Sequence, residues 1–295
     1  MTDKQLFTVV GPRPEHAALG KKGAHDKSFP LVSAILLCVI VLCCMFAEVL
    51  MTKDPTYMDL ANFNVAPNRE FLFGTDTLGR DIFSDIWYGG RISISIGFLA
   101  TVISTFIAVV YGSLSGIAPA WLDTGMMRFT EIILSVPSLL IVLFVQAILG
   151  DANVLTLSVV IGVTSWASIA KVIRTEVRQI RSSEYVVASK CMGGSFFHIL
   201  RVHLAPNFLP SILFMVIMNV RGAILAESTL SFLGLGLPLE VVSWGSMLSL
   251  SEKALLTGSW WIIVIPGVFL VATLLSLTEI GNAVRKRANR SRRIL

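Results

Sequence analysis

The sequence predicts an all-α integral membrane protein, a polytopic bundle of about six transmembrane helices, and three observations predict it. Mean hydropathy is +0.76 and only 15% of the 295 residues are charged, whereas soluble domains carry roughly 25%. Apolar runs recur along the chain, and about 20 residues suffice for a helix to cross a hydrocarbon core of about 30 Å. Basic residues lie between these runs and at the ends rather than on one face of a folded domain. That distribution indicates membrane topology and argues against a nucleic-acid partner.

The N-terminal part of the chain is predicted to be a polar tail followed by a first membrane helix. Residues 1–29 are polar and interrupted by Gly and Pro, and residues 30–51 form the first apolar run. A cleavable signal peptide is the alternative, because basic residues precede the run. The run exceeds the roughly 7–15 apolar residues of a signal peptide, and no small-residue cleavage site follows it. We therefore expect a retained transmembrane helix.

The rest of the chain is predicted to form the main transmembrane domain, residues 91–282, after an extracytoplasmic loop at 52–90. Its apolar runs lie at 92–118, 126–149, 154–173, 208–225 and 260–280. Six spans place both ends on one side, and positive charge marks the cytoplasmic side of a membrane. Lys and Arg concentrate between the fourth and fifth spans and in the tail 283–295. The N-terminus, the loop 183–207 and the C-terminus are therefore expected in the cytoplasm.

The loop 183–207 is a polar, basic island between two apolar runs. It reads as two short helices joined by Gly193 and Gly194, because a glycine pair ends a helix without a Cβ penalty. Ser195 is placed to cap the second helix, which is predicted to stop at Pro206. One face of the pair is apolar and the other basic. An ordinary amphipathic connector on the bilayer surface is the alternative interpretation.

Motifs for catalysis and metal binding are absent from the sequence. It contains no phosphate-binding G-x-x-x-x-G-K-[ST] loop and no H-E-x-x-H, so we expect neither ATP hydrolysis nor metal catalysis by this chain. Its four cysteines, Cys38, Cys43, Cys44 and Cys191, lack the paired spacing of a disulfide or zinc framework. They are predicted to be small packing residues, and we expect the chain to be no enzyme.

The loop 183–207 resembles the EAA loop of inner-membrane permease subunits of ATP-binding cassette (ABC) importers. The spacing of Ala188, Gly193 and Pro206 carries the resemblance, while Val187 and Ser189 depart from the family's Glu and Ala. In that family the loop docks into an ATPase subunit. The resemblance implies an ATPase-coupling role for Glu184, Tyr185, Ala188, Ser189, Gly193, Ser195, His203 and Pro206.

Three further segments resemble the dipeptide, oligopeptide and nickel branch of these importers. They are residues 73–98 (FGTDTLGRDIFSDIWYGGRISISIGF), residues 133–140 (ILSVPSLL) and the pair 229–236 (TLSFLGLG) with 243–248 (SWGSML). Pro137 is predicted to kink its helix. From the residues alone, Gly74 and Gly79 mark turns, and the charges at 76–85 are expected to pair locally. The resemblance implies the fold of a type I ABC importer permease.

The implied function is ATP-driven import across a bacterial or archaeal cytoplasmic membrane. Implied partners are a homologous second permease, two ATPase subunits that bind ATP and Mg, and an extracytoplasmic substrate-binding protein. Peptides are the expected cargo, with nickel or other metal chelates, glutathione and opines as alternatives. An ion- or proton-driven secondary transporter is the rival from another class. It is disfavoured because the sequence shows neither repeated halves nor a cluster of acids at the bilayer midplane.

Two ionisable residues in the fifth span are candidates for the translocation pathway, because charges inside membranes are usually functional. Arg221 lies near the middle of the span and Glu227 about two turns on. A guanidinium at Arg221 can bind a peptide carboxylate through two hydrogen bonds. The alternative is that Arg221 pairs with an acidic residue of a neighbouring helix or of the partner permease.

Overall fold

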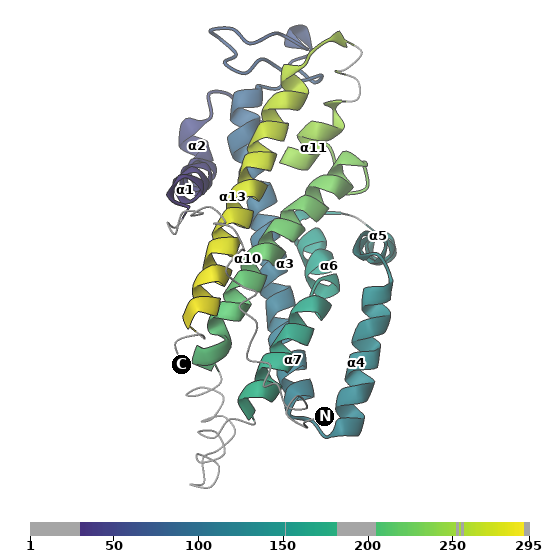
Figure 1. Cartoon of the computed structure of the whole chain (residues 1–295). Coiled ribbons are helices and arrows are strands. Elements are labelled where there is room, and N and C mark those ends of the chain that lie inside the picture. Colours follow the sequence, from purple (N-terminus) through teal and green to yellow (C-terminus); the bar gives the residue numbers. More distant parts are fainter. Residues whose placement is uncertain (1–29, 151, 182–204, 252–253, 255–256, 292–295) are drawn as a thin grey trace, which may run out of the picture.

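The protein is a bundle of helices around three long ones. The computed structural model describes residues 30–150, 152–181, 205–251, 254 and 257–291. Within these residues the chain is helical, apart from loops and one isolated β-bridge between Thr75 and Asp81. The helices long and apolar enough to cross a membrane belong to α3 (Ile82–Ile117), α10 (Ala205–Phe232) and α13 (Trp261–Ser291). They run together along the long axis of the molecule (Figure 1), which confirms the all-α membrane fold.

Two further pairs of helices are long and apolar enough to cross a membrane only when each bent pair is taken together. α4 (Ala120–Ser135) and α5 (Ser138–Leu149) meet at 90°, and α6 (Val154–Thr164) meets α7 (Ala167–Arg181) at 45°. The predicted kink at Pro137 is thus a complete break. Val136 before it is extended, with φ −93° and ψ 133°, because a proline disfavours helical geometry in the preceding residue.

The first apolar run is not one long helix. It divides into α1 (Leu31–Met45) and α2 (Ala47–Leu50), separated at Phe46. With 15 residues, α1 is shorter than the roughly 20 that a perpendicular crossing requires, and Figure 1 shows it nearly end-on beside α13. The sequence predicted six spans. By length and composition the described residues contain three helices able to cross a membrane, or up to five such segments if each bent pair is one span.

The second span begins earlier than predicted. The loop expected at residues 52–90 ends at Asp81, whose carboxylate accepts a hydrogen bond from the backbone N–H of Ser84 at 3.2 Å and so caps α3. The loop contains one 3₁₀ turn, η1 (Leu60–Asn62). Its end lies at the same end of the bundle as the start of α13 (Figure 1). The prediction from hydropathy began this helix at residue 92, where its apolar part starts, and so left out its polar first turns.

Three of the charges at residues 76–85, Asp76, Arg80 and Asp85, pair locally, as predicted, but they are buried rather than at the surface, while Asp81 caps α3. The side chain of Arg80 is 1% exposed, and its Nε donates to Asp76 Oδ2 at 2.8 Å and lies 3.7 Å from Asp85 Oδ2. Gly74 and Gly79 both have φ of +76°, a conformation that favours glycine. Both predicted turns are therefore confirmed.

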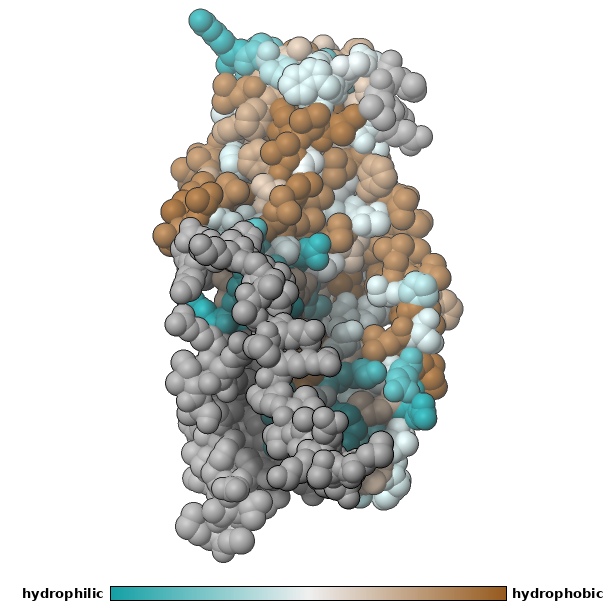
Figure 2. All heavy atoms as spheres, viewed as in Figure 1, coloured by the Kyte–Doolittle hydropathy of each residue, from teal (hydrophilic) through white to brown (hydrophobic). Residues whose placement is uncertain are grey.

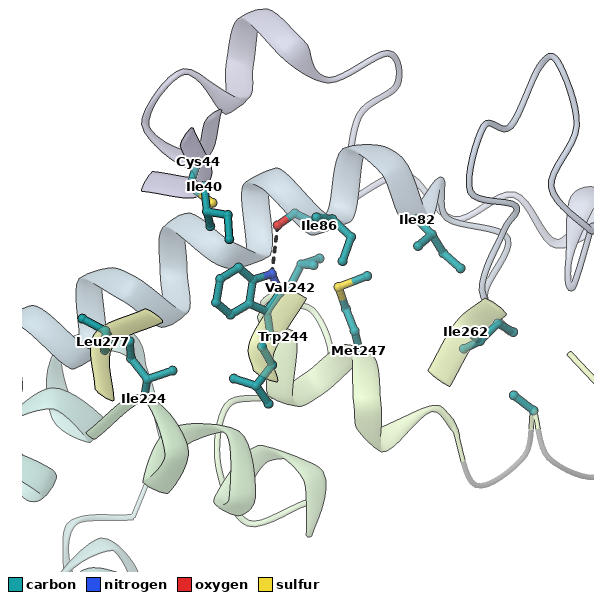
Figure 3. Packing of buried hydrophobic residues seen from close by; sticks show 12 residues of the cluster. Ile40, Cys44, Ile82, Ile86, Ile224, Val242, Trp244, Met247, Ile262 and Leu277 are labelled. Carbon is teal, nitrogen blue, oxygen red and sulfur yellow. Dashed lines mark hydrogen bonds between the residues drawn. The ribbon is translucent and has the colours of Figure 1, made fainter. Parts of the chain in front are cut away.

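Trp244 occupies the centre of a core that joins α1, α3, α10 and α13. It begins the short helix α11 (Trp244–Ser249), is fully buried and donates from its indole Nε1 to the carbonyl of Ile86 at 3.0 Å (Figure 3). Gly90 permits this packing, since a Cβ there would lie 2.5 Å from the sulfur of Cys44 and 2.6 Å from the Trp244 ring. The core therefore depends on a glycine at this close approach.

The surface has the distribution expected of a membrane protein. Figure 2 shows a broad apolar band across the middle of the bundle and polar residues at the loop end. Large apolar side chains are exposed on several helices, including Phe106 of α3, Phe144 of α5 and Leu275 of α13. Such residues are stable when they face hydrocarbon.

Candidate functional site

The predicted ATPase-coupling loop lies mostly outside the described residues. This holds for Glu184, Tyr185, Ala188, Ser189, Gly193, Ser195 and His203. The two flanks are described: α7 ends at Arg181 and α10 begins at Ala205, and both lie at one end of the bundle (Figure 1). Pro206 falls in the first turn of α10, where a proline is tolerated because its missing N–H has no helical partner there. The predicted loop helix that would stop at Pro206 lies outside the described residues, so that prediction stays a prediction.

At this end of the bundle a buried carboxylate joins three helices. Asp123, in the first turn of α4, accepts hydrogen bonds from Arg174 Nε and Nη2 of α7, both at 2.5 Å. Arg178 Nη1 lies 3.2 Å from the same carboxylate, and Ser115 Oγ of α3 donates to it at 2.7 Å. Sequence reasoning missed this group because it attributed Arg174 and Arg178 to topology alone. The sequence does contain a signal for this contact: an acidic residue in the first turn of one span, and two arginines four positions apart, on one face of another helix.

Arg221 lies in α10 without a carboxylate partner among the described residues. Its side chain is partly exposed, its Nε is buried without a hydrogen-bond partner, and the adjacent Gly222 is exposed. Glu227 is six positions further along, which is about 240° around the helix axis. The structure therefore places these two predicted pathway residues on different faces of α10.

Glu227 is enclosed by serine hydroxyls. Its side chain is 0% exposed, and its carboxylate accepts from Ser93 at 2.9 Å, Ser231 at 3.0 Å, Ser243 at 2.8 Å and Ser228 at 3.3 Å. These serines come from α3, α10 and the residue that caps α11. Hydroxyl donors thus replace the water that a buried carboxylate loses. We call this group the Glu227 cluster.

The Glu227 cluster brings the two segments 229–236 and 243–248 together. Ser243 and Ser246 form a capping box, with Ser246 N–H donating to Ser243 Oγ at 3.0 Å and Ser243 N–H to Ser246 Oγ at 2.8 Å. Trp244 N–H donates to Ser93 Oγ at 3.2 Å. A Cβ on Gly245 would lie 2.7 Å from the Cα of Ser228. Both segments therefore fold around one carboxylate and hold α11 against α3 and α10.

One stripe of α3 contributes to each of these polar contacts. Ser93, Ser104 and Ser115 follow one another at intervals of eleven residues and are all fully buried. A step of eleven residues rotates about the helix axis by about 20° more than three complete turns, so the three hydroxyls lie on one face of α3. Their hydrogen-bond partners are, in order, Glu227, Asn219 and Asp123.

The described residues contain no group of three His, Cys, Asp or Glu side chains able to hold a metal ion. The arrangement is one of buried polar contacts between helices, together with an arginine in a membrane span that has no described carboxylate partner.

Comparison with known proteins decides the family. The model of the binding-protein-dependent transport system inner membrane component matches residues 108–290. The chain belongs to this family. It is a transport permease family rather than a family of enzymes. The matched region includes Asp123, Arg174, Arg221 and Glu227.

The permease is also similar to named relatives. It is 38% identical to the dipeptide transport system permease protein DppC of Bacillus subtilis over 226 residues, 77% of this chain and 70% of the relative. It is 36% identical to the oligopeptide transport system permease protein OppC of the same organism over 261 residues, 88% of this chain and 85% of the relative. A putative peptide permease protein of Brucella suis is 35% identical over 232 residues, 78% of this chain and 76% of the relative.

Proposed function

We propose that the chain is a permease subunit of an ATP-driven peptide importer and forms half of its translocation pathway. The observation that carries this proposal is the similarity to permeases of dipeptide and oligopeptide transport systems over 77% and 88% of the chain. The names of these relatives favour di- and oligopeptides over nickel chelates, glutathione or opines. Arg221 supports the same cargo, because a guanidinium that has no carboxylate partner in the described part of the chain can receive a peptide's terminal carboxylate.

The partners of this permease follow from the same family. A second, homologous permease completes the pathway, two ATPase subunits bind ATP and Mg, and an extracytoplasmic binding protein delivers the peptide. The ATPases dock at the loop 183–207, so that this end of the bundle and both chain termini face the cytoplasm. The loop 52–81 and the start of α13 then face the binding protein.

Transport depends on linking ATP binding to the orientation of the helices. Closure of the ATPase pair moves the loop 183–207, and the bundle passes between inward-open and outward-open states. ATP must bind one of these states more tightly, because equal affinity for both would shift no population. The permease therefore contributes the pathway and the mechanical link, while the chemistry of ATP hydrolysis takes place on its partners.

The test is purification of the chain from its native membrane in mild detergent, followed by reconstitution of what accompanies it. We expect an ATPase pair, a homologous permease and a binding protein, and vesicles that accumulate a labelled peptide only with ATP. A labelled nickel chelate serves as the matched cargo control. Purification of the chain alone, or peptide uptake driven by an ion gradient without ATP, would contradict the proposal.

A further inference from the structure

We propose that Asp123 is a positioning residue that couples the ATPase-docking loop to the bent helix pair α4–α5 during transport. This inference rests on the proposed function and adds a specific residue to it. The observation that carries it is the contact of the buried Asp123 carboxylate with Arg174 of α7, whose side chain is 22% exposed, and with Ser115 of α3. Arg178 of α7 adds a more exposed contact to the same carboxylate, since its side chain is 49% exposed.

The contact is built to hold its helices in a fixed relation. Asp123 is 3% exposed, and both of its oxygens bind the Arg174 guanidinium. A two-pronged arginine–carboxylate pair fixes orientation as well as distance, and its charged hydrogen bonds are about twice as strong as neutral ones. Since Ser115 adds a third helix, a displacement of α7 cannot leave α4 and α3 unaffected while the contact persists.

The position of the contact along the chain connects it with the loop 183–207. Arg174 and Arg178 lie one turn apart on the same face of α7, which ends at Arg181 just before the loop. Movement of the docked loop therefore reaches Asp123 through about two turns of continuous helix. From Asp123 it passes into α4, and beyond Pro137 into α5, which lies at 90° to α4.

A second link between the same two helices provides a matched comparison. Lys171 Nζ of α7 lies 3.9 Å from Glu131 Oε1 of α4, and the two side chains are 43% and 46% exposed. An exposed ion pair at this distance contributes little, because water and salt screen it. The structure thus assigns the mechanical link to Asp123 and a minor role to Lys171.

The test uses the complete transporter, reconstituted in vesicles with its ATPases, second permease and binding protein. The measured quantity is the number of labelled peptides taken up per ATP hydrolysed. This ratio does not depend on how much assembled complex the vesicles contain. For Asp123→Asn we expect a reduction of about tenfold, within the usual range of coupling between sites, while ATP hydrolysis continues. Lys171→Gln should stay within about twofold of the unmodified transporter, as expected for an exposed pair.

A second variant covers poor folding of the first. Arg174→Lys keeps the positive charge but removes the two-pronged geometry, and Ser115 and Arg178 remain available to Asp123. A lowered ratio of peptides to ATP in Arg174→Lys supports the inference even where Asp123→Asn gives little assembled complex. The inference is overturned if the ratio of peptides to ATP is unchanged in both Asp123→Asn and Arg174→Lys. It is also overturned if Lys171→Gln lowers this ratio as much as those two variants do. Failure of the unmodified complex to take up peptide with ATP instead overturns the proposed function.

Discussion

Replacement of Glu227 by alanine tests the claim that one carboxylate holds α11 in place. It removes the acceptor of four serine hydroxyls within a fully buried site. Hydrogen bonds to a charged group contribute about 1.5–3 kcal/mol each, so loss of four without replacement would cost at least about 6 kcal/mol. Helical serines can instead donate to a carbonyl one turn back. We therefore expect the free energy of unfolding to fall by about 3 kcal/mol, roughly half of that minimum.

The assay is thermal unfolding of the purified permease in mild detergent. A loss of about 3 kcal/mol corresponds to a lowering of Tm on the order of 10 °C. Glu48→Ala is the matched control, since Glu48 is 69% exposed and makes one ion pair with Arg91 at 2.8 Å. It should change stability by about 0–1 kcal/mol. Glu227→Gln retains an acceptor and a similar volume, so its Tm should lie between those of the two alanine variants.

Equal Tm values for Glu227→Ala and Glu48→Ala would refute the reasoning, because the four hydroxyls would then have found partners at no cost. A stabilised Glu227→Ala would refute it more strongly. That result would mean that burying the carboxylate costs more than its hydrogen bonds return.

Three other substitutions test different parts of the molecule. Gly90→Ala should lower the unfolding free energy by about 1–3 kcal/mol, the usual cost of overpacking, because its methyl group would overlap the Cys44 sulfur and the Trp244 indole. The control Gly222→Ala, whose site is open, should leave the Tm unchanged or raised. Equal losses of stability in the two variants would contradict the packing argument. Arg221→Gln should reduce uptake of peptides with a free C-terminal carboxylate more than uptake of their amidated forms, since only the carboxylate gains from a guanidinium; an equal effect on both cargoes would exclude that contact. Gly193→Val should abolish peptide uptake by obstructing the turn between the two predicted loop helices, and a variant that still binds the ATPases and transports would contradict the role of that turn.

The sequence predicted those features that depend on composition and local chemistry. The apolar runs predicted the membrane fold, and Gly74 and Gly79 predicted two turns that the structure confirms. Pro137 predicted a kink, where the structure has a complete break between two helices. The family was predictable because several motifs occur in the right order, and the match over residues 108–290 confirms it.

The remainder depends on contacts between distant parts of the chain. The buried bonds of Glu227 to Ser93 and Ser243 join residues 134 and 16 positions apart, and hydropathy does not contain this information. The length of α1 was mispredicted for a related reason. An apolar run reports the total hydrophobicity of a segment and does not show where its helix breaks, which here is at Phe46. The roles of Arg221 and of the loop 183–207 remain predictions.

The serine stripe on α3 constrains the kind of motion that this helix can make. α3 is 36 residues long without interruption, about 54 Å at 1.5 Å per residue, so it behaves as a stiff rod. A roll of the rod about its own axis would withdraw Ser93, Ser104 and Ser115 from their partners at the same moment, since all three point the same way. A tilt could exchange one contact while keeping the other two. Among rigid movements of the bundle, α3 therefore favours rocking over rotation.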